Sequence, residues 1–204
     1  MNIKDYTIWS KSTLPSSVHN SMMSLNSPYN DVFDKLLLNR ILFLSGEINL
    51  YTSEIIKSQM LYLENLDSKK DITIYINSPG GSVYDGLGIV DIMDHVSPDV
   101  STVNTGLAAS MGAIILCSGA NGKRKALKRS RTMIHQPLSF GYAQQASDME
   151  IEVRQINHLK KDLCEIIANK TGNSYKKVFK DCDRDYWLSA KDSLKYGMID
   201  KIVK

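Results

Sequence analysis

Short apolar runs that alternate with stretches of helical periodicity constrain the fold of this 204-residue chain more than any other feature. Apolar, β-branched or aromatic runs occupy residues 41–46, 72–76 and 100–104, and the segment 52–66 has apolar residues at helical spacing. Strands that alternate with helices in this way form mostly parallel sheets with helices packed on their faces. The chain is therefore predicted to have an α/β fold.

The beginning and the second half of the chain depart from this alternation. Residues 1–30 are rich in Ser and Asn and show no sustained period, so we predict a mobile N-terminal arm ahead of one domain at 31–204. Thr52 or Ser53 is expected to cap the first predicted helix. The remaining expected elements are a helix at 86–95, short strands at 123–127 and 131–134, helices at 148–170, 173–181 and 190–196, and a strand at 198–203.

The long predicted helix at 148–170 has an unusually narrow apolar stripe. Its members lie three, four or seven residues apart and are Met149, Val153, Ile156, Leu163 and Ile167. Such a stripe on a long helix is typical of packing against another helix, including one from another chain.

Charge and cysteine content exclude few partners. The net charge of +3 argues neither for nor against nucleic acid. Lys123 to Arg131 holds six basic residues in nine positions, but no aromatic residues interleave with them, which favours a solvated hairpin face over a phosphate-binding patch. Three cysteines at wide spacing match neither a disulfide framework nor a zinc site and suit a reducing compartment.

No segment of the sequence indicates export or membrane insertion. The N-terminus has no apolar core of a signal peptide, and the longest small-and-apolar run, 106–120, is shorter than the about 20 residues that span a bilayer. No P-loop motif occurs, since "GANGKR" lacks its spacing and hydroxyl. We expect a cytoplasmic protein without cofactor or metal, and without nucleic-acid or membrane partners.

Ser110 lies in "GLAASMGAI", among small and apolar residues, where a predicted strand meets a predicted helix. Serine is a favoured N-cap, and position alone favours that structural role. The alternative is a nucleophile, because a helix N-terminus offers unpaired N–H groups and partial positive charge to a developing oxyanion. A serine nucleophile also needs a base, and the base needs a group that orients it.

Two other segments could complete such a site. His135 closes the apolar strand "TMI", and side chains at strand ends often face a cleft, whereas the other three histidines are more typical of solvated positions. The paired glycines of "NSPGG" (77–81) could expose the backbone N–H groups of an oxyanion hole, although the segment alone is more typical of a plain turn.

Four sequence blocks in their order and spacing resemble the proteolytic subunit of the Clp protease family. The blocks are "YINSPGGSVYDGLGIVD", "GLAASMGAIILCSGANGKR", "SRTMIHQPL" and "DRDYWLSAKDSLKYGMID", and the resemblance runs from about Ile41 to the C-terminus. It implies a crotonase-like fold, a repeated β-β-α spiral with a protruding handle helix, the handle region covering about 136–170. It also implies a serine endopeptidase without cofactor.

The same resemblance implies roles for individual residues. Ser110 matches the nucleophile, His135 the general base and Asp185 the carboxylate that orients the histidine, although Asp181 and Asp183 lie close by. The resemblance also implies that Gly81 and Met111 form the oxyanion hole. It further implies that Asp183 and Arg184 make contacts between rings and that Tyr75 takes part in docking a partner. Thr73 stands where an aromatic residue is common in that docking pocket.

The implied assembly is a tetradecamer of two stacked heptameric rings. A separate Clp-family AAA+ ATPase is expected to feed it unfolded proteins, whereas peptide substrates would enter unaided. Two alternatives are a catalytically inactive subunit of a mixed ring and a crotonase-type acyl-CoA enzyme. An inactive subunit typically lacks a member of the Ser–His–Asp set, and acyl-CoA enzymes of this fold generally work through carboxylates. All three residues are present here.

Overall fold

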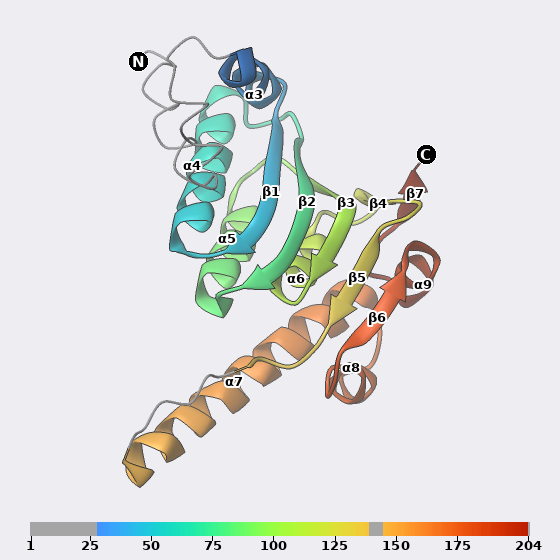
Figure 1. Cartoon of the computed structure of the whole chain (residues 1–204). Helices are drawn as coiled ribbons and strands as arrows, with labels where there is room; N and C mark the ends of the chain where they lie inside the picture. Colours follow the sequence, from blue (N-terminus) through green and yellow to red (C-terminus); the bar gives the residue numbers. More distant parts are fainter. Residues whose placement is uncertain (1–27, 139–144, 204) are drawn as a thin grey trace.

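A computed structural model describes residues 28–138 and 145–203 of the chain, which form an α/β structure (Figure 1). The elements in order are α3 (Pro28–Leu38), β1 (Ile41–Ile48), α4 (Leu50–Leu66), β2 (Ile72–Gly81), α5 (Val83–His95), β3 (Val100–Ala109), α6 (Met111–Ser118), β4 (Arg124–Leu127), β5 (Arg131–Ile134), α7 (Ala146–Thr171), α8 (Tyr175–Asp181), β6 (Tyr186–Ser189), α9 (Ala190–Tyr196) and β7 (Lys201–Val203). The predicted arm at 1–30 lies outside the described residues up to residue 27, and α3 begins at Pro28.

The sheet is mostly parallel, as predicted. Its main path is β1-β2-β3-β4-β7, and every pair on this path is parallel. The first three strands are each followed by a helix, and these helices (α4, α5 and α6) pack against one another in that order. The apolar side chains on one face of β2 are fully buried, namely Ile72, Ile74 and Ile76. This order places the carboxyl ends of β2 and β3 side by side.

The two short strands after β3 do not form the hairpin expected at Lys123–Arg131. β4 pairs with the first half of β3, at Thr102 to Asn104, whereas β5 pairs with its second half, at Leu107 to Ala109. Both pairings are parallel, so β3 has two successive partners on one edge. β5 then pairs with β6 in the antiparallel direction.

The basic run is also less solvated than expected. Arg124 is buried, and its Nε donates to Asp200 Oδ2 at 3.0 Å. Its Nη1 donates to the Lys170 carbonyl at 2.7 Å, which ties β4 to the end of α7.

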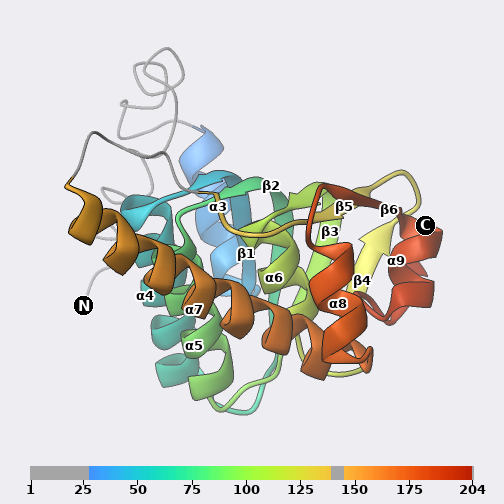
Figure 2. The same cartoon turned by 90° about the horizontal axis from the view of Figure 1, so that it is seen from below.

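Helix α7 is the protruding helix that the resemblance implied (Figure 1). Seen from below, it crosses α6, against which it packs (Figure 2). Leu163 and Ile167, in its C-terminal half, belong to the buried core, while Met149 and Val153, near its N-terminal end, are exposed. The helix ends at Gly172, whose φ of 74° is left-handed.

Two local predictions were wrong for identifiable reasons. The cap of α4 is Asn49, whose side chain accepts the N–H groups of Tyr51 and Thr52, while the Thr52 hydroxyl accepts the Asn49 N–H in return. "NSPGG" is the end of strand β2 rather than a turn after it, because Gly81 still pairs with Ile48 of β1. No helix in the described ranges is long and apolar enough to cross a membrane.

Candidate active site

Ser110 lies at the turn between β3 and α6, where its backbone has φ 54° and ψ −125°. This positive φ is unfavourable for a residue with a side chain, because its Cβ crowds the backbone. The turn is held by the Ser110 N–H, which donates to the Met133 carbonyl at 2.9 Å. Although Ser110 occupies the N-cap position, its hydroxyl makes no capping hydrogen bond to α6. The side chain is therefore free to act elsewhere.

The Ser110 hydroxyl lies 2.9 Å from Nε2 of His135. Nδ1 of the same imidazole lies 3.1 Å from Oδ1 of Asp185. An ionised carboxylate only accepts hydrogen bonds, so Nδ1 carries the proton, and its N–H donates a hydrogen bond to Asp185. Nε2 then has the lone pair that accepts the Ser110 hydroxyl. The three residues form one continuous chain of hydrogen bonds.

The pairing of β5 with β6 brings His135 and Asp185 together. The last pair of this antiparallel ladder is Ile134 with Tyr186. His135, which follows β5, therefore lies opposite Asp185, which precedes β6. The His135 side chain is 14% exposed and that of Asp185 is 60% exposed. The imidazole is thus shielded between the serine and the carboxylate.

The strand register separates Asp185 from its two acidic neighbours. Asp181, at the end of α8, accepts hydrogen bonds from Lys177 and from the Tyr196 hydroxyl. Asp183 is exposed, and its Oδ2 lies 3.8 Å from Nη1 of Arg184. Of the three predicted candidates, Asp185 is the one that the structure brings to His135.

The carboxyl end of β2 lies against the Ser110 turn. A Cβ atom on Gly80, which has φ 95°, would lie 2.5 Å from Ser110 Cβ and 3.0 Å from the Met111 nitrogen. Gly80 donates its own N–H to Ser78 Oγ at 3.1 Å, and Ser82 donates to the Ile48 carbonyl at 2.8 Å. Gly80 was not among the predicted site residues, and only its place in the glycine pair marked it.

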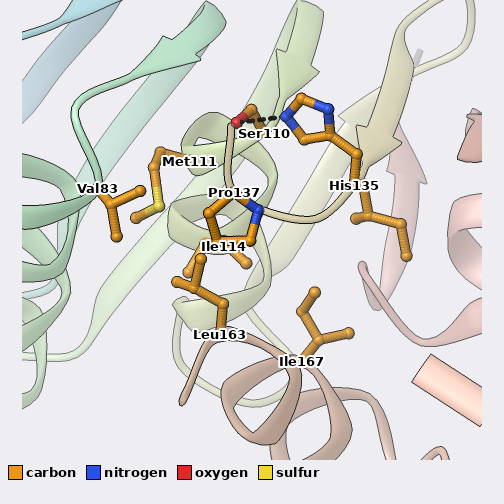
Figure 3. Close-up of a pocket in the computed structure, with 9 residues that line it drawn as sticks. Val83, Ser110, Met111, Ile114, His135, Pro137, Leu163 and Ile167 are labelled. Carbon is orange, nitrogen blue, oxygen red and sulfur yellow. Dashed lines mark hydrogen bonds between the residues drawn. The ribbon is translucent and has the colours of Figure 1, made fainter. Parts of the chain in front are cut away.

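A small pocket lies beside Ser110 and His135 (Figure 3). Apart from these two residues its lining is apolar and consists of Val83, Met111, Ile114, Ile134, Pro137, Leu163 and Ile167. Figure 3 shows several of these side chains gathered below the hydrogen bond between Ser110 and His135. Leu163 and Ile167 come from α7, where the sequence marked them only as part of an apolar stripe.

The other predicted residues lie away from this pocket. Asp183 and Arg184 are exposed, and Arg184 Nη1 donates to the Asp183 carbonyl at 2.9 Å. Tyr75 stacks on Phe43 with ring centroids 5.6 Å apart, and Phe43 meets Phe33 edge to face. Within the described ranges no group of three or more His, Cys, Asp or Glu side chains could hold a metal ion.

A serine, histidine and aspartate joined in this order, at the N-terminus of a helix, form the arrangement by which serine hydrolases activate a hydroxyl. The Clp protease family model matches residues 25–204. The chain belongs to the Clp protease family. The resemblance predicted from the four sequence blocks is therefore confirmed.

Relatives of known name are similar over most of their length. The ATP-dependent Clp protease proteolytic subunit of Bacteroides fragilis is 53% identical over 179 residues, which cover 88% of this chain and 86% of the relative. The protein of the same name from Porphyromonas gingivalis is 52% identical over 180 residues, or 88% of this chain and 81% of the relative. ATP-dependent Clp protease proteolytic subunit 2 of Parasynechococcus marenigrum is 49% identical over 173 residues, covering 85% and 87%.

Proposed function

We propose that this chain is the proteolytic subunit of an ATP-dependent Clp protease and acts as a serine endopeptidase. The observation that carries the proposal is the hydrogen-bonded chain from Ser110 through His135 to Asp185. Family membership and the names of relatives at about 50% identity support it. An inactive ring subunit or an acyl-CoA enzyme would not need these hydrogen bonds between Ser110, His135 and Asp185.

In the proposed reaction Ser110 Oγ attacks the carbonyl carbon of a peptide bond while His135 Nε2 takes the hydroxyl proton. Asp185 keeps the imidazole in the correct tautomer and stabilises the imidazolium. When the tetrahedral intermediate collapses, His135 returns that proton to the leaving amine, and the acyl group stays on Ser110. Water then attacks the acyl-enzyme while His135 Nε2 takes one of its protons, and His135 returns that proton to Ser110 Oγ as the new carboxyl end leaves.

The oxyanion is proposed to form beside the N-terminus of α6. Met111 is the first residue of this helix, and we expect its N–H to point into the site together with the partial positive charge of the helix end. Gly81 is the second proposed donor. Because Ser82 directs its N–H toward β1, the neighbouring Gly81 N–H is expected to point to the opposite edge of the strand.

The apolar pocket is proposed to hold the substrate side chain that precedes the cleaved bond. Its lining offers aliphatic carbon and methionine side chains below the nucleophile, so apolar side chains would gain free energy there by leaving water. Substrates with a charged residue at this position are expected to be cleaved poorly.

Ring assembly and a partner ATPase are further parts of the proposal. Met149, Ile151 and Val153 of α7 are each 47% exposed or more, which suits a helix that packs against another chain. The exposed aromatic cluster around Tyr75 and Phe43 suits a docking site for the Clp-family AAA+ ATPase. Two stacked heptameric rings would enclose the serines in a chamber reached by unfolded proteins and peptides.

Peptide hydrolysis by serine variants tests the proposal. Ser110→Ala should lower turnover by roughly 10⁴–10⁶-fold, as loss of a triad member does. Ser58→Ala is the matched control, because Ser58 lies exposed on α4. Peptides with Leu, Met or Asp before the cleaved bond should show that apolar residues are preferred. Equal hydrolysis by Ser110→Ala and the unaltered protein would contradict the proposed role of Ser110.

A further inference from the structure

The segment that carries Asp185 has to be held in place, because 60% of the Asp185 side chain is exposed to solvent. The β5–β6 ladder fixes this segment on one side, at Tyr186. On the other side, the Gln136 side chain holds the segment, because its Nε2 donates a hydrogen bond to the Asp183 carbonyl at 2.9 Å. Asp185 therefore lies between two points that are both attached to the segment from β5 to Gln136.

Gln136 is itself fixed by Lys160 of α7. Lys160 Nζ donates to Gln136 Oε1 at 2.8 Å and lies 4.2 Å from the centre of the Phe179 ring on α8. A lysine ammonium only donates, so it selects the amide orientation in which Oε1 faces Lys160 and Nε2 faces the Asp183 carbonyl. The opposite orientation would place two donors together at Lys160 and two acceptors together at Asp183.

We propose that Gln136 and Lys160 are positioning residues that keep Asp185 facing His135. The hydrogen bonds from Lys160 to Gln136 and from Gln136 to the Asp183 carbonyl thus connect helix α7 to the hydrogen bonds of Asp185, His135 and Ser110. Neither residue touches the substrate or takes part in proton transfer. This inference rests on the proposed function of Ser110, His135 and Asp185.

Four variants separate the links of this network. Lys160→Met keeps the aliphatic stem and removes the donor. Gln136→Glu keeps an acceptor for Lys160 but has no N–H for the Asp183 carbonyl, whereas Lys160→Arg keeps a cationic donor. Lys161→Met is the matched control, because Lys161 is the next residue of α7, is 63% exposed and pairs with Glu165.

Peptide hydrolysis and the rate of fluorophosphonate labelling are measured on the full chain. For Lys160→Met and Gln136→Glu, kcat and the labelling rate should each fall about tenfold at unchanged KM, as expected for the loss of one hydrogen bond of the network. Lys160→Arg should restore most of the activity, and Lys161→Met should match the unaltered protein. Final labelling should still reach one adduct per chain, because a positioning role slows the reaction without removing active molecules.

The Asp185→Asn background gives the decisive comparison. If Gln136 and Lys160 act through Asp185, adding Lys160→Met to Asp185→Asn should lower kcat no further. A full additional tenfold loss, unchanged kcat in both single variants, or a final labelled fraction that falls in proportion to kcat would overturn the proposal. Absence of label at Ser110 in the unaltered protein would instead overturn the proposed function on which it rests.

Discussion

Ser110 has a backbone conformation that residues with side chains rarely adopt. Its hydroxyl is hydrogen-bonded to His135 and does not cap the helix that follows it. A non-glycine residue in such a region stores on the order of 1–3 kcal/mol of strain. This conformation places the Ser110 side chain next to the end of β2. Gly80 permits this approach because it has no Cβ to collide with the serine.

The strain at Ser110 can be measured with two variants at this position. Ser110→Gly should be more stable than Ser110→Ala by about 1 kcal/mol, because glycine adopts a positive φ without a Cβ clash while alanine retains it. Thermal unfolding of both proteins gives the comparison. An alanine variant with the higher Tm would show that the turn is not strained.

The close approach of Gly80 predicts a large loss of activity in Gly80→Ala. Its Cβ would meet Ser110 Cβ at 2.5 Å and the Ala109 carbonyl oxygen at 2.7 Å, so Ser110 has to move. A displacement of about 1 Å in a reacting group can lower the rate roughly 10²-fold.

Gly122→Ala provides the control for this glycine variant in the same peptide assay. Gly122 also has a positive φ, of 81°, but a Cβ there would meet nothing within 4 Å. Similar activity in both variants would mean that backbone strain, and not contact with Ser110, explains any effect at Gly80.

At the scale of elements, the site is assembled by strands that end together. β3 carries Ser110 at its end, β5 pairs with that end of β3, and β6 pairs with β5. The Arg124–Asp200 pair lies farther from the site, where β4, β7 and the end of α7 meet. Burial raises the pKa of the Asp200 carboxyl, but hydrogen bonds from Arg124 outweigh this and bring the pKa below its usual value.

The Arg124–Asp200 pair predicts a pH-dependent contribution to stability. Asp200→Asn should lower the free energy of unfolding by about 3 kcal/mol at neutral pH, because Arg124 remains buried without its counter-charge. A carboxyl whose pKa is lowered on folding stabilises the protein above about pH 4 and loses this effect as the pH falls through its folded value. The difference in Tm between the variant and the unaltered protein should therefore shrink below pH ~4. A difference that stays constant from pH 7 to pH 3 would contradict the role of the ion pair.

The sequence predicted the order of elements better than their partners. The alternation of apolar runs with helical spacing located β1, β2, β3 and α7, because burial on one face imposes a local period. Local pattern carries no information on strand pairing, and so the separate places of β4 and β5 along β3 were missed. Gly and Pro in "NSPGG" indicated a turn, but this segment still belongs to β2 because it pairs with β1.

The candidate site was predicted through family resemblance more than through chemistry. Asp181, Asp183 and Asp185 are alike in residue type, and only the β5–β6 register decides which one meets His135. Gln136 and Lys160 are 24 residues apart, so their hydrogen bond depends on how α7 packs. The pocket lining likewise combines residues of β5, α6 and α7 that have no common local pattern.

At the scale of the whole molecule, the single chain leaves surfaces that suit assembly. The family resemblance assigns the exposed Arg184 to contacts between rings, and the exposed end of α7 suits packing against another chain. Arg184 precedes Asp185 directly, so a contact made by Arg184 would also hold the segment that orients His135. Such a contact would couple assembly to catalysis through this one segment.

Arg184→Ala is predicted to weaken ring stacking and peptidase activity together. Arg184 is 83% exposed in the single chain, so its replacement should leave the fold of the subunit unchanged. Analytical ultracentrifugation and peptide hydrolysis on the same sample report both effects. A variant that dissociates yet cleaves peptides at the normal rate would separate assembly from catalysis and contradict the coupling.

The most direct test of the account is the site of covalent labelling by a fluorophosphonate, because this reagent reacts with a serine hydroxyl that a neighbouring base activates. Intact-mass and peptide mass spectrometry should find one adduct per chain, located on Ser110, and no adduct in Ser110→Ala. His135→Ala should label far more slowly, since the base that takes the proton is gone. Label on Ser82 or Ser118, or label that persists in Ser110→Ala, would contradict the assignment of Ser110 as the nucleophile.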